Sequence, residues 1–95
     1  MVVGVLKLEL TIPENHSLKG KRSVIKRIQA RVGNDFNVST TECGDQDLWQ
    51  RAILGFAAAG TSETVVEATL RRIIDCVEDL GLAQLGAAEV ECFHC

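Results

Sequence analysis

Hydrophobic and polar residues alternate along the first segment of the chain, residues 2–12. Strict alternation is typical of a β-strand that buries one face, so this segment is predicted to be a long strand. Gly4 shares the buried face, while Val3 and Val5 lie on the other face with polar residues. Residues 13–16 are predicted to form a loop. The predicted core-facing side chains are Val2, Leu6, Leu8, Leu10 and Ile12.

The next segment has apolar residues at helical spacing. Ser17 is predicted to cap a helix that runs to about Val32, with Gly33-Asn34 as its stop. Its apolar stripe should lie on the sheet, because a helix of this kind buries one face. The stripe consists of Leu18, Val24, Ile25, Ile28 and Val32.

The remaining pattern predicts two more strands, a second helix and a final strand. The strands span Phe36–Cys43 and Trp49–Ala59, and the turn residues Gly44–Asp47 connect them as a hairpin. The helix begins at Thr61 or Ser62 and ends at Gly81, and the last strand covers Gln84–Cys92.

The order β-α-β-β-α-β predicts the α+β class and a ferredoxin-like sandwich. In this fold a four-stranded antiparallel sheet carries two helices on one face and leaves the other face open. The third strand is apolar on both faces, so either Ile53 with Ala57 or Leu54 with Ala58 points outward, next to Val3 and Val5. An open apolar face favours a homo-oligomer packed through the sheet. The alternative is a neutral surface dominated by alanine and glycine.

Composition indicates one globular domain over residues 1–95. The chain has 46% hydrophobic and 24% charged residues, which is ordinary for a folded protein. The first residues lack the features of a signal peptide, and Lys7 and Glu9 interrupt any membrane span. We therefore expect a cytoplasmic protein without membrane contact, in which the four cysteines are reduced.

Charge is divided unevenly along the chain. Residues 15–34 contain six basic residues and no acid, whereas the rest holds four basic and thirteen acidic residues, a net charge of −9. This separation predicts an anionic partner for the first helix. The free amides at the helix start also attract anions, and the phosphates of RNA are suitable anions for this site. The alternative is that these basic residues only form a solvated helix face without a partner. The candidate contacts are Lys19, Lys21, Arg22, Lys26, Arg27 and Arg31.

Two segments resemble the YlxP-like family of small uncharacterised bacterial proteins. Ser17-Leu18-Lys19-Gly20-Lys21-Arg22 is similar to that family's Ser-Leu-Lys-Glu-Lys-Arg, with Gly20 in place of the glutamate. The second similar segment is Gly44-Asp45-Gln46-Asp47-Leu48-Trp49-Gln50-Arg51-Ala52. The resemblance covers nearly the whole chain and implies a ferredoxin-like fold without an assigned activity. The family's genes tend to lie beside those of transcription, translation and ribosome-binding factors, which implies a role linked to RNA or ribosome maturation.

The second of these segments has two interpretations. Asp45, Gln46 and Asp47 could contribute to a metal site with Glu42, but carboxylates in a tight turn more often cap backbone amides. Trp49, Gln50 and Arg51 could form a recognition corner that makes secondary contacts to the partner. Alternatively, Trp49 anchors the core and Arg51 pairs with a hairpin aspartate. Because aromatic residues are few, RNA contacts are expected to rest on phosphates and shape rather than on base stacking.

Cys92-Phe93-His94-Cys95 could suggest zinc or redox chemistry, but no second ligand pair has matching spacing. We expect a frayed tail, no metal and no cofactor. His16 and His94, the only histidines, have no nucleophile beside them, so no enzyme is predicted. The sequence thus favours a cytosolic protein that binds RNA or a ribosomal particle. The alternatives are a protein–protein adaptor or a small-anion binder.

Overall fold

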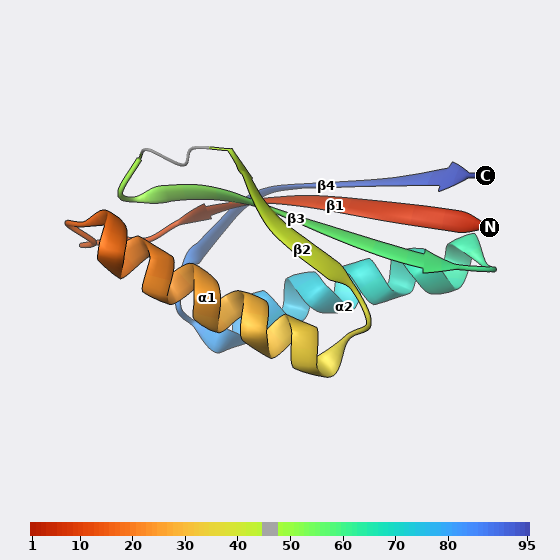
Figure 1. The fold of residues 1–95 in the computed structure, drawn as a ribbon, viewed down its shortest axis with the longest axis horizontal. Coiled ribbons are helices and arrows are strands. Elements are labelled where there is room, and N and C mark those ends of the chain that lie inside the picture. Colours follow the sequence, from red (N-terminus) through yellow and green to blue (C-terminus); the bar gives the residue numbers. More distant parts are fainter. Residues whose placement is uncertain (45–47) are drawn as a thin grey trace.

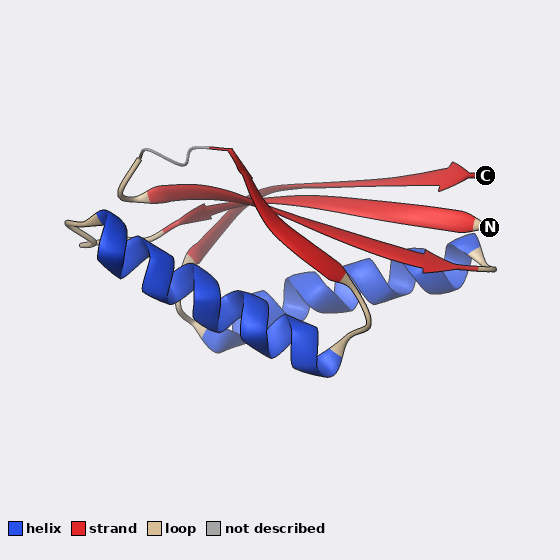
Figure 2. Ribbon diagram, viewed as in Figure 1, coloured by secondary structure: helices blue, strands red, loops and turns tan. Residues whose placement is uncertain are grey.

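The computed structural model describes residues 1–44 and 48–95 and contains a sheet with two helices packed against one face (Figures 1 and 2). The element order is β-α-β-β-α-β, which confirms the predicted ferredoxin-like fold. The elements are β1 (Val2–Thr11), α1 (Leu18–Asp35), β2 (Ser39–Gly44), β3 (Arg51–Gly60), α2 (Glu63–Leu80) and β4 (Gln84–His94).

The sheet has strand order β2-β3-β1-β4, and all neighbouring strands are antiparallel. β1 and β3 pair without a register shift from Val2 opposite Gly60 to Thr11 opposite Arg51. The edge strands are less regular, since the register shifts near Leu8 on the β4 side and near Glu42 in β2. The two most apolar strands therefore occupy the centre of the sheet, where both neighbours protect their backbone.

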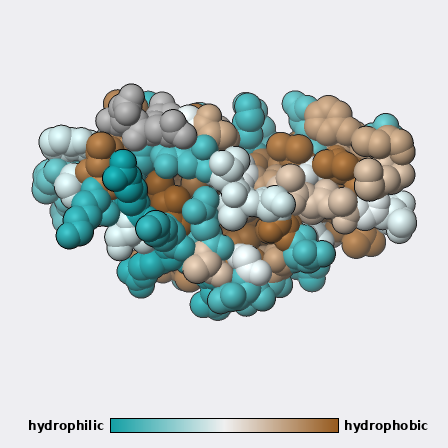
Figure 3. Space-filling model, viewed as in Figure 1, coloured by the Kyte–Doolittle hydropathy of each residue, from teal (hydrophilic) through white to brown (hydrophobic). Residues whose placement is uncertain are grey.

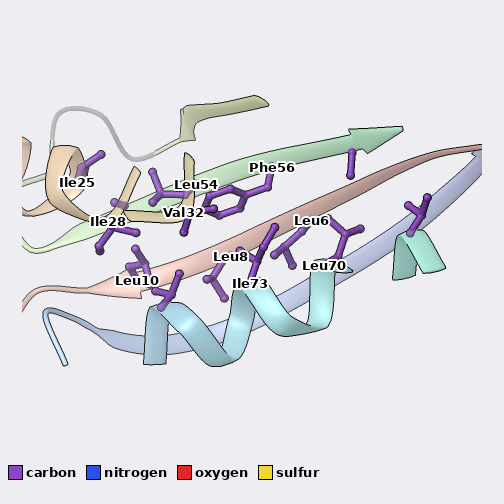
Figure 4. Packing of buried hydrophobic residues seen from close by; sticks show 14 of the residues in the cluster. Leu6, Leu8, Leu10, Ile25, Ile28, Val32, Leu54, Phe56, Leu70 and Ile73 are labelled. Atoms are coloured by element: carbon purple, nitrogen blue, oxygen red, sulfur yellow. The ribbon is translucent and has the colours of Figure 1, made fainter. Parts of the chain in front are cut away.

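The core lies between the sheet and the helices, where the buried side chains of both layers meet (Figure 4). β1 alternates between buried and more exposed positions, as its sequence predicts. Pairing with β1 also settles the orientation of β3: Leu54 and Ala58 point to the helices, whereas Ile53 and Ala57 lie on the open face. Phe56 is the largest apolar side chain in the core.

Both helices begin with a serine cap, and α2 also ends with a glycine cap. The Ser17 hydroxyl accepts a hydrogen bond from the Gly20 amide at 3.0 Å, and Ser62 does the same for Val65 at 3.4 Å. Gly81 ends α2 in the left-handed conformation (φ 64°), which glycine adopts without a steric penalty. The predicted caps Ser17 and Gly81 are confirmed.

The predicted stop of α1 at Gly33-Asn34 was wrong. The helix continues to Asp35 and ends where the backbone of Phe36 becomes extended (φ −135°). A glycine inside a helix costs only about 1 kcal/mol, which the packing of the neighbouring turns offsets. Phe36 and Val38 pack against the core, and the second strand therefore begins at Ser39 rather than at Phe36.

The end of the chain was also predicted incorrectly as a frayed tail. β4 pairs with β1 as far as His94 opposite Val2. Beyond it, the amide of Cys95 donates to the carbonyl of Met1 at 2.8 Å, and the amino group of Met1 donates to the carbonyl of Cys95 at 3.1 Å. The two ends therefore lie side by side (Figure 1). Neither helix is long and apolar enough to cross a membrane, over the residues that the structure describes.

Candidate nucleic-acid interface

The loop before α1 and the segment before β3 meet at one end of the molecule (Figure 1). Asn15 joins them, because its side-chain amide donates to the carbonyl oxygens of both Ser17 and Trp49. The side chain of Gln50 donates back to the carbonyl of Asn15 at 3.2 Å. The amide of Ile12 donates to the carbonyl of Gln50 at 2.8 Å. The fold thus brings together the two segments that carry the family resemblance, and we call their meeting point the corner (residues 12–22 and 48–51).

Gly20 has a specific place in the corner. A β-carbon added at this position would collide with the side-chain oxygen of Asn15, and it would lie 3.2 Å from the Ser17 hydroxyl oxygen. The space that a side chain would need is taken by the Asn15 amide. Gly20 therefore allows Asn15 to reach across to Trp49, at the cost of a residue that weakens the helix by about 1 kcal/mol.

Trp49 lies on the surface, so its interpretation as a core anchor was wrong. Trp49 is 52% exposed, and Leu48 before it is 46% exposed. Trp49 lies two residues before β3 begins, outside the regular part of the sheet. Together with Gln50 and Arg51 these residues line an open hollow of about 410 Å³. The structure therefore presents an aromatic side chain to solvent next to the start of α1.

Lys21 does not belong to the exposed cations, although it was predicted among them. It is 1% exposed, and its Nζ lies 3.1 Å from Oε2 of Glu42 on β2. Lys21 shares a helical face with Ile25, Ile28 and Val32, at spacings of four, seven and eleven residues. It therefore points to the sheet, where Glu42 meets it. The ion pair ties the first turn of α1 to β2, and Lys21 is not available for a phosphate.

The other predicted cations all lie on the surface of α1. Arg31 pairs with Asp35 one turn later, with 2.8 Å between Nε and Oδ2. This hydrogen bond and the charge of Asp35 raise the pKa of Arg31. The other four have no ion-pair partner among the residues that the structure describes, and we call them the basic face. They are Lys19, Arg22, Lys26 and Arg27.

The basic face begins in the corner and follows the helix. Lys19, Arg22 and Lys26 occur at spacings of three and four residues, so they form one row about 10 Å long. Hydrophilic side chains cover this surface of the molecule, whereas apolar surface gathers at the opposite end, where β3 ends (Figure 3). Exposed cations and an exposed tryptophan are thus concentrated at the same end of the protein.

The other predicted site residues are distributed as follows. Asp45, Gln46 and Asp47 lie outside the described residues. Cys92 is half-buried against α2, and burial is the main cause that raises the pKa of its thiol. On extended backbone, positions 92 and 95 point to opposite faces, so Cys92 and Cys95 do not converge. Among residues 1–44 and 48–95, no group of three or more potential ligands (His, Cys, Asp, Glu) gathers to hold a metal ion.

No sequence pattern singled out Asn15, and Glu42 was considered only as a metal ligand. Asn15 precedes the helix cap, a common place for a residue with purely local hydrogen bonds. Its bond to Trp49 spans 34 positions and depends on the tertiary fold. The partnership of Glu42 with Lys21 likewise joins two elements whose proximity only the fold reveals.

The architecture and the corner define a ferredoxin-like α+β domain with a basic helix and an exposed aromatic residue beside it. Residues 3–90 match the profile of the family described as "Protein of unknown function (DUF503)", and the chain belongs to this family. It is 43% identical over 77 residues to the "Uncharacterized protein YlxP" of Bacillus subtilis (strain 168), an alignment that covers 81% of this chain and 84% of that protein.

Solved structures of similar shape share the fold only. The protein YJCS superposes with a TM-score of 0.58 at 10% identity, covering 94% of this chain and 96% of that one. A de novo designed protein with a ferredoxin fold, LFR1 1, gives 0.57 at 14% identity, covering 96% and 86%. Since both identities are low, the likeness supports the architecture and says nothing about activity.

Proposed function

We propose that this protein is a non-enzymatic, cytosolic binding protein that docks on RNA or a ribosomal particle through the basic face and the corner. The observation that carries the proposal is the concentration of four cations without ion-pair partners in the described structure and a half-exposed tryptophan at one end of the molecule. The positive charge of the basic face contrasts with the net charge of −3 for the whole chain.

Two physical effects make this surface suited to RNA. Cations that neutralise phosphates release condensed counterions, which favours binding at low salt. An exposed aromatic ring offers a surface on which an unpaired base stacks, and such stacking contributes about 1–3 kcal/mol per base. The sequence favours recognition of RNA through phosphates and shape. The exposed ring of Trp49 extends this recognition to the unpaired bases of single-stranded segments. Arg51 lies two residues further along, as a secondary contact.

A charge-reversal experiment tests the basic face. The variant Lys19→Glu/Arg22→Glu is compared with Arg71→Glu/Arg72→Glu, which makes the same charge change on exposed residues of α2. RNA affinity is measured by filter binding over a range of salt concentrations. We expect the α1 variant to bind at least about tenfold more weakly, with a salt slope shallower by about 1.4–1.8, and the α2 variant to bind within about twofold of wild type. Equal losses in both variants would indicate a non-specific effect of net charge.

The single tryptophan of the chain gives a direct readout of the corner. If a base stacks on Trp49, single-stranded RNA should quench its fluorescence, whereas a blunt duplex should not. Trp49→Phe should keep most of the affinity for single strands, and Trp49→Ala should bind them about 5- to 150-fold more weakly. Binding without any quenching would remove Trp49 from the interface and leave the basic face alone.

A final comparison separates free RNA from a ribosomal particle. Wild type and the α1 variant are sedimented with purified small ribosomal subunits at low and at physiological salt. Co-sedimentation that persists at physiological salt and disappears in the α1 variant would support the particle as the partner. If neither RNA nor the particle binds wild type at low salt, the proposal is refuted.

A further inference from the structure

The open face of the sheet is hollowed along its centre and edges. An apolar hollow of about 250 Å³ lies over β1, β2 and β3, where Gly55 leaves space between Val5 and Thr41. Two further hollows lie near Glu9 and Ala87, about 160 Å³, and near Val3 and Ala59, about 310 Å³. The helices cover only the other face, so these depressions have no partner in the described part of the chain.

This face does not suit RNA. Its acids, Glu9, Glu89 and Glu91, outnumber its cations, Lys7 and Arg51. Phosphates, which are also negatively charged, would meet three carboxylates on it, two of them on β4 beside the exposed aromatic ring of Phe93. Nucleic acid is therefore expected on the basic face, which lies on the helical layer, and a protein surface is expected here.

We infer that the open sheet face binds a second copy of this chain, forming a dimer through sheet-on-sheet packing. Charge is the first argument. A two-fold interface must be complementary to itself, and this face carries both signs. Lys7 has no ion-pair partner among the described residues, and neither do Glu89 and Glu91 on the neighbouring strand β4. A second copy must therefore be placed so that its carboxylates do not meet the carboxylates of the first.

Strand order is consistent with such a pairing. A two-fold axis parallel to the strands, between β3 and β1, would place each acidic β4 over the β2 of the other copy. The open side of β2 carries Ser39, Thr41 and Cys43, none of which is acidic. The same operation places each β1 over the hollow at Gly55 of the other copy, so larger side chains meet small ones. Sheets stacked in this way lie about 10 Å apart.

Area is the second argument. Ten-residue strands about 34 Å long, spaced about 4.8 Å apart, give a face of about 600 Å² when the shorter β2 is allowed for. Two such faces bury about 1,200 Å², which reaches the lower limit of stable interfaces and exceeds most crystal contacts. A dimer of micromolar affinity is expected at this size. The inference does not depend on the proposed RNA function, because the two surfaces lie on opposite layers.

Oligomeric state tests the inference. In sedimentation equilibrium, the average mass of wild type should rise through the micromolar range and approach twice the chain mass of 10.3 kDa at higher concentrations. Gly55→Glu places a carboxylate in the hollow, where a β-carbon would lie at ordinary contact distances of 3.5 Å or more from its neighbours. Lys7→Glu reverses the charge of another residue that lines the hollow and makes the face more acidic. Each should raise the dissociation constant of the dimer at least about tenfold. Ala68→Glu, the same charge added on exposed α2, should leave it unchanged.

Thiol labelling gives a local readout. Cys43 lines the hollow and is exposed, whereas Cys76 lies on α2. The ratio of Cys43 to Cys76 labelling, measured by peptide mass spectrometry, should fall several-fold as wild-type concentration rises, and should stay constant in Gly55→Glu. A monomer at all concentrations would overturn the inference. So would a dimer that survives both face variants, which would place the contact elsewhere, or protection of Cys43 by RNA in the monomer.

Discussion

The buried ion pair between Lys21 and Glu42 leads to a quantitative prediction. Each residue is replaced by methionine, singly and together, to keep a similar volume without charge. Removing one partner of a fully buried pair costs about 3–5 kcal/mol, because the other charge loses its compensation. The side chain of Glu42 is 23% exposed and that of Lys21 only 2%, so water compensates the carboxylate better than the ammonium. We therefore expect Lys21→Met to cost about 2–3 kcal/mol and Glu42→Met to cost more.

Urea unfolding followed by far-ultraviolet circular dichroism measures these differences. Tryptophan fluorescence is less suitable, since Trp49 is already half exposed in the folded state. With an m-value of about 1.3 kcal/mol/M for a chain of this size, Lys21→Met should lower the midpoint by about 2 M. The double variant should lose less than the sum of the single losses, because both charges are then absent. Strictly additive losses, or single losses below about 0.5 kcal/mol, would refute the argument.

Lys21→Met also distinguishes a role of Lys21 in stability from a role in RNA binding. Lys21→Met removes one positive charge from the first turn of α1, as Lys19→Met does. Because Lys21 is buried, its loss should leave RNA affinity within about twofold at temperatures where the protein is folded, whereas Lys19→Met should reduce it several-fold. Equal reductions would mean that Lys21 contributes to the binding surface after all.

Three further predictions concern the caps, the core and a thiol. Ser17→Ala should lower the free energy of unfolding by about 1 kcal/mol because the Gly20 amide loses its acceptor, while Ser23→Ala on the exposed side of α1 should be neutral or slightly stabilising. Phe56→Ala should cost about 3–5 kcal/mol, measured by the same urea unfolding, because it empties the centre of the core. Burial raises the pKa of the Cys92 thiol above its ordinary 9.0, so stability should fall as pH rises past about 9, where the unfolded thiol ionises first.

Each of these predictions has its own control. Equal effects of the two serine variants would show that the hydroxyl of Ser17 does not act as a cap. A loss below about 1 kcal/mol in Phe56→Ala would mean that the core collapses around the missing ring. For the thiol, Cys92→Ala should remove the loss of stability above pH 9. Cys95→Ala, at an exposed position, should leave that loss of stability intact. An unchanged profile in Cys92→Ala would assign that dependence to other groups.

Local pattern determined much of this fold. The alternation in β1 identified its buried face, and the serine and glycine at the two helix ends identified the caps, because both signals depend on residues only a few positions apart. The order of elements then left few ways to pack them. The concentration of positive charge on α1 could also be predicted from the sequence, because it is a property of one contiguous segment.

The tertiary structure decided which side chains of these elements reach solvent. β3 is apolar on both faces, so only its pairing with β1 could assign Ile53 to the open face. Lys21 follows the spacing of the buried stripe, but a lysine is expected there only once Glu42 is known to face it from β2. Trp49 is exposed because the strand begins two residues later, and Asn15 holds its backbone there from a distant loop. Spacing along the chain reports which residues share a face, whereas the partner of that face comes from elsewhere in the fold.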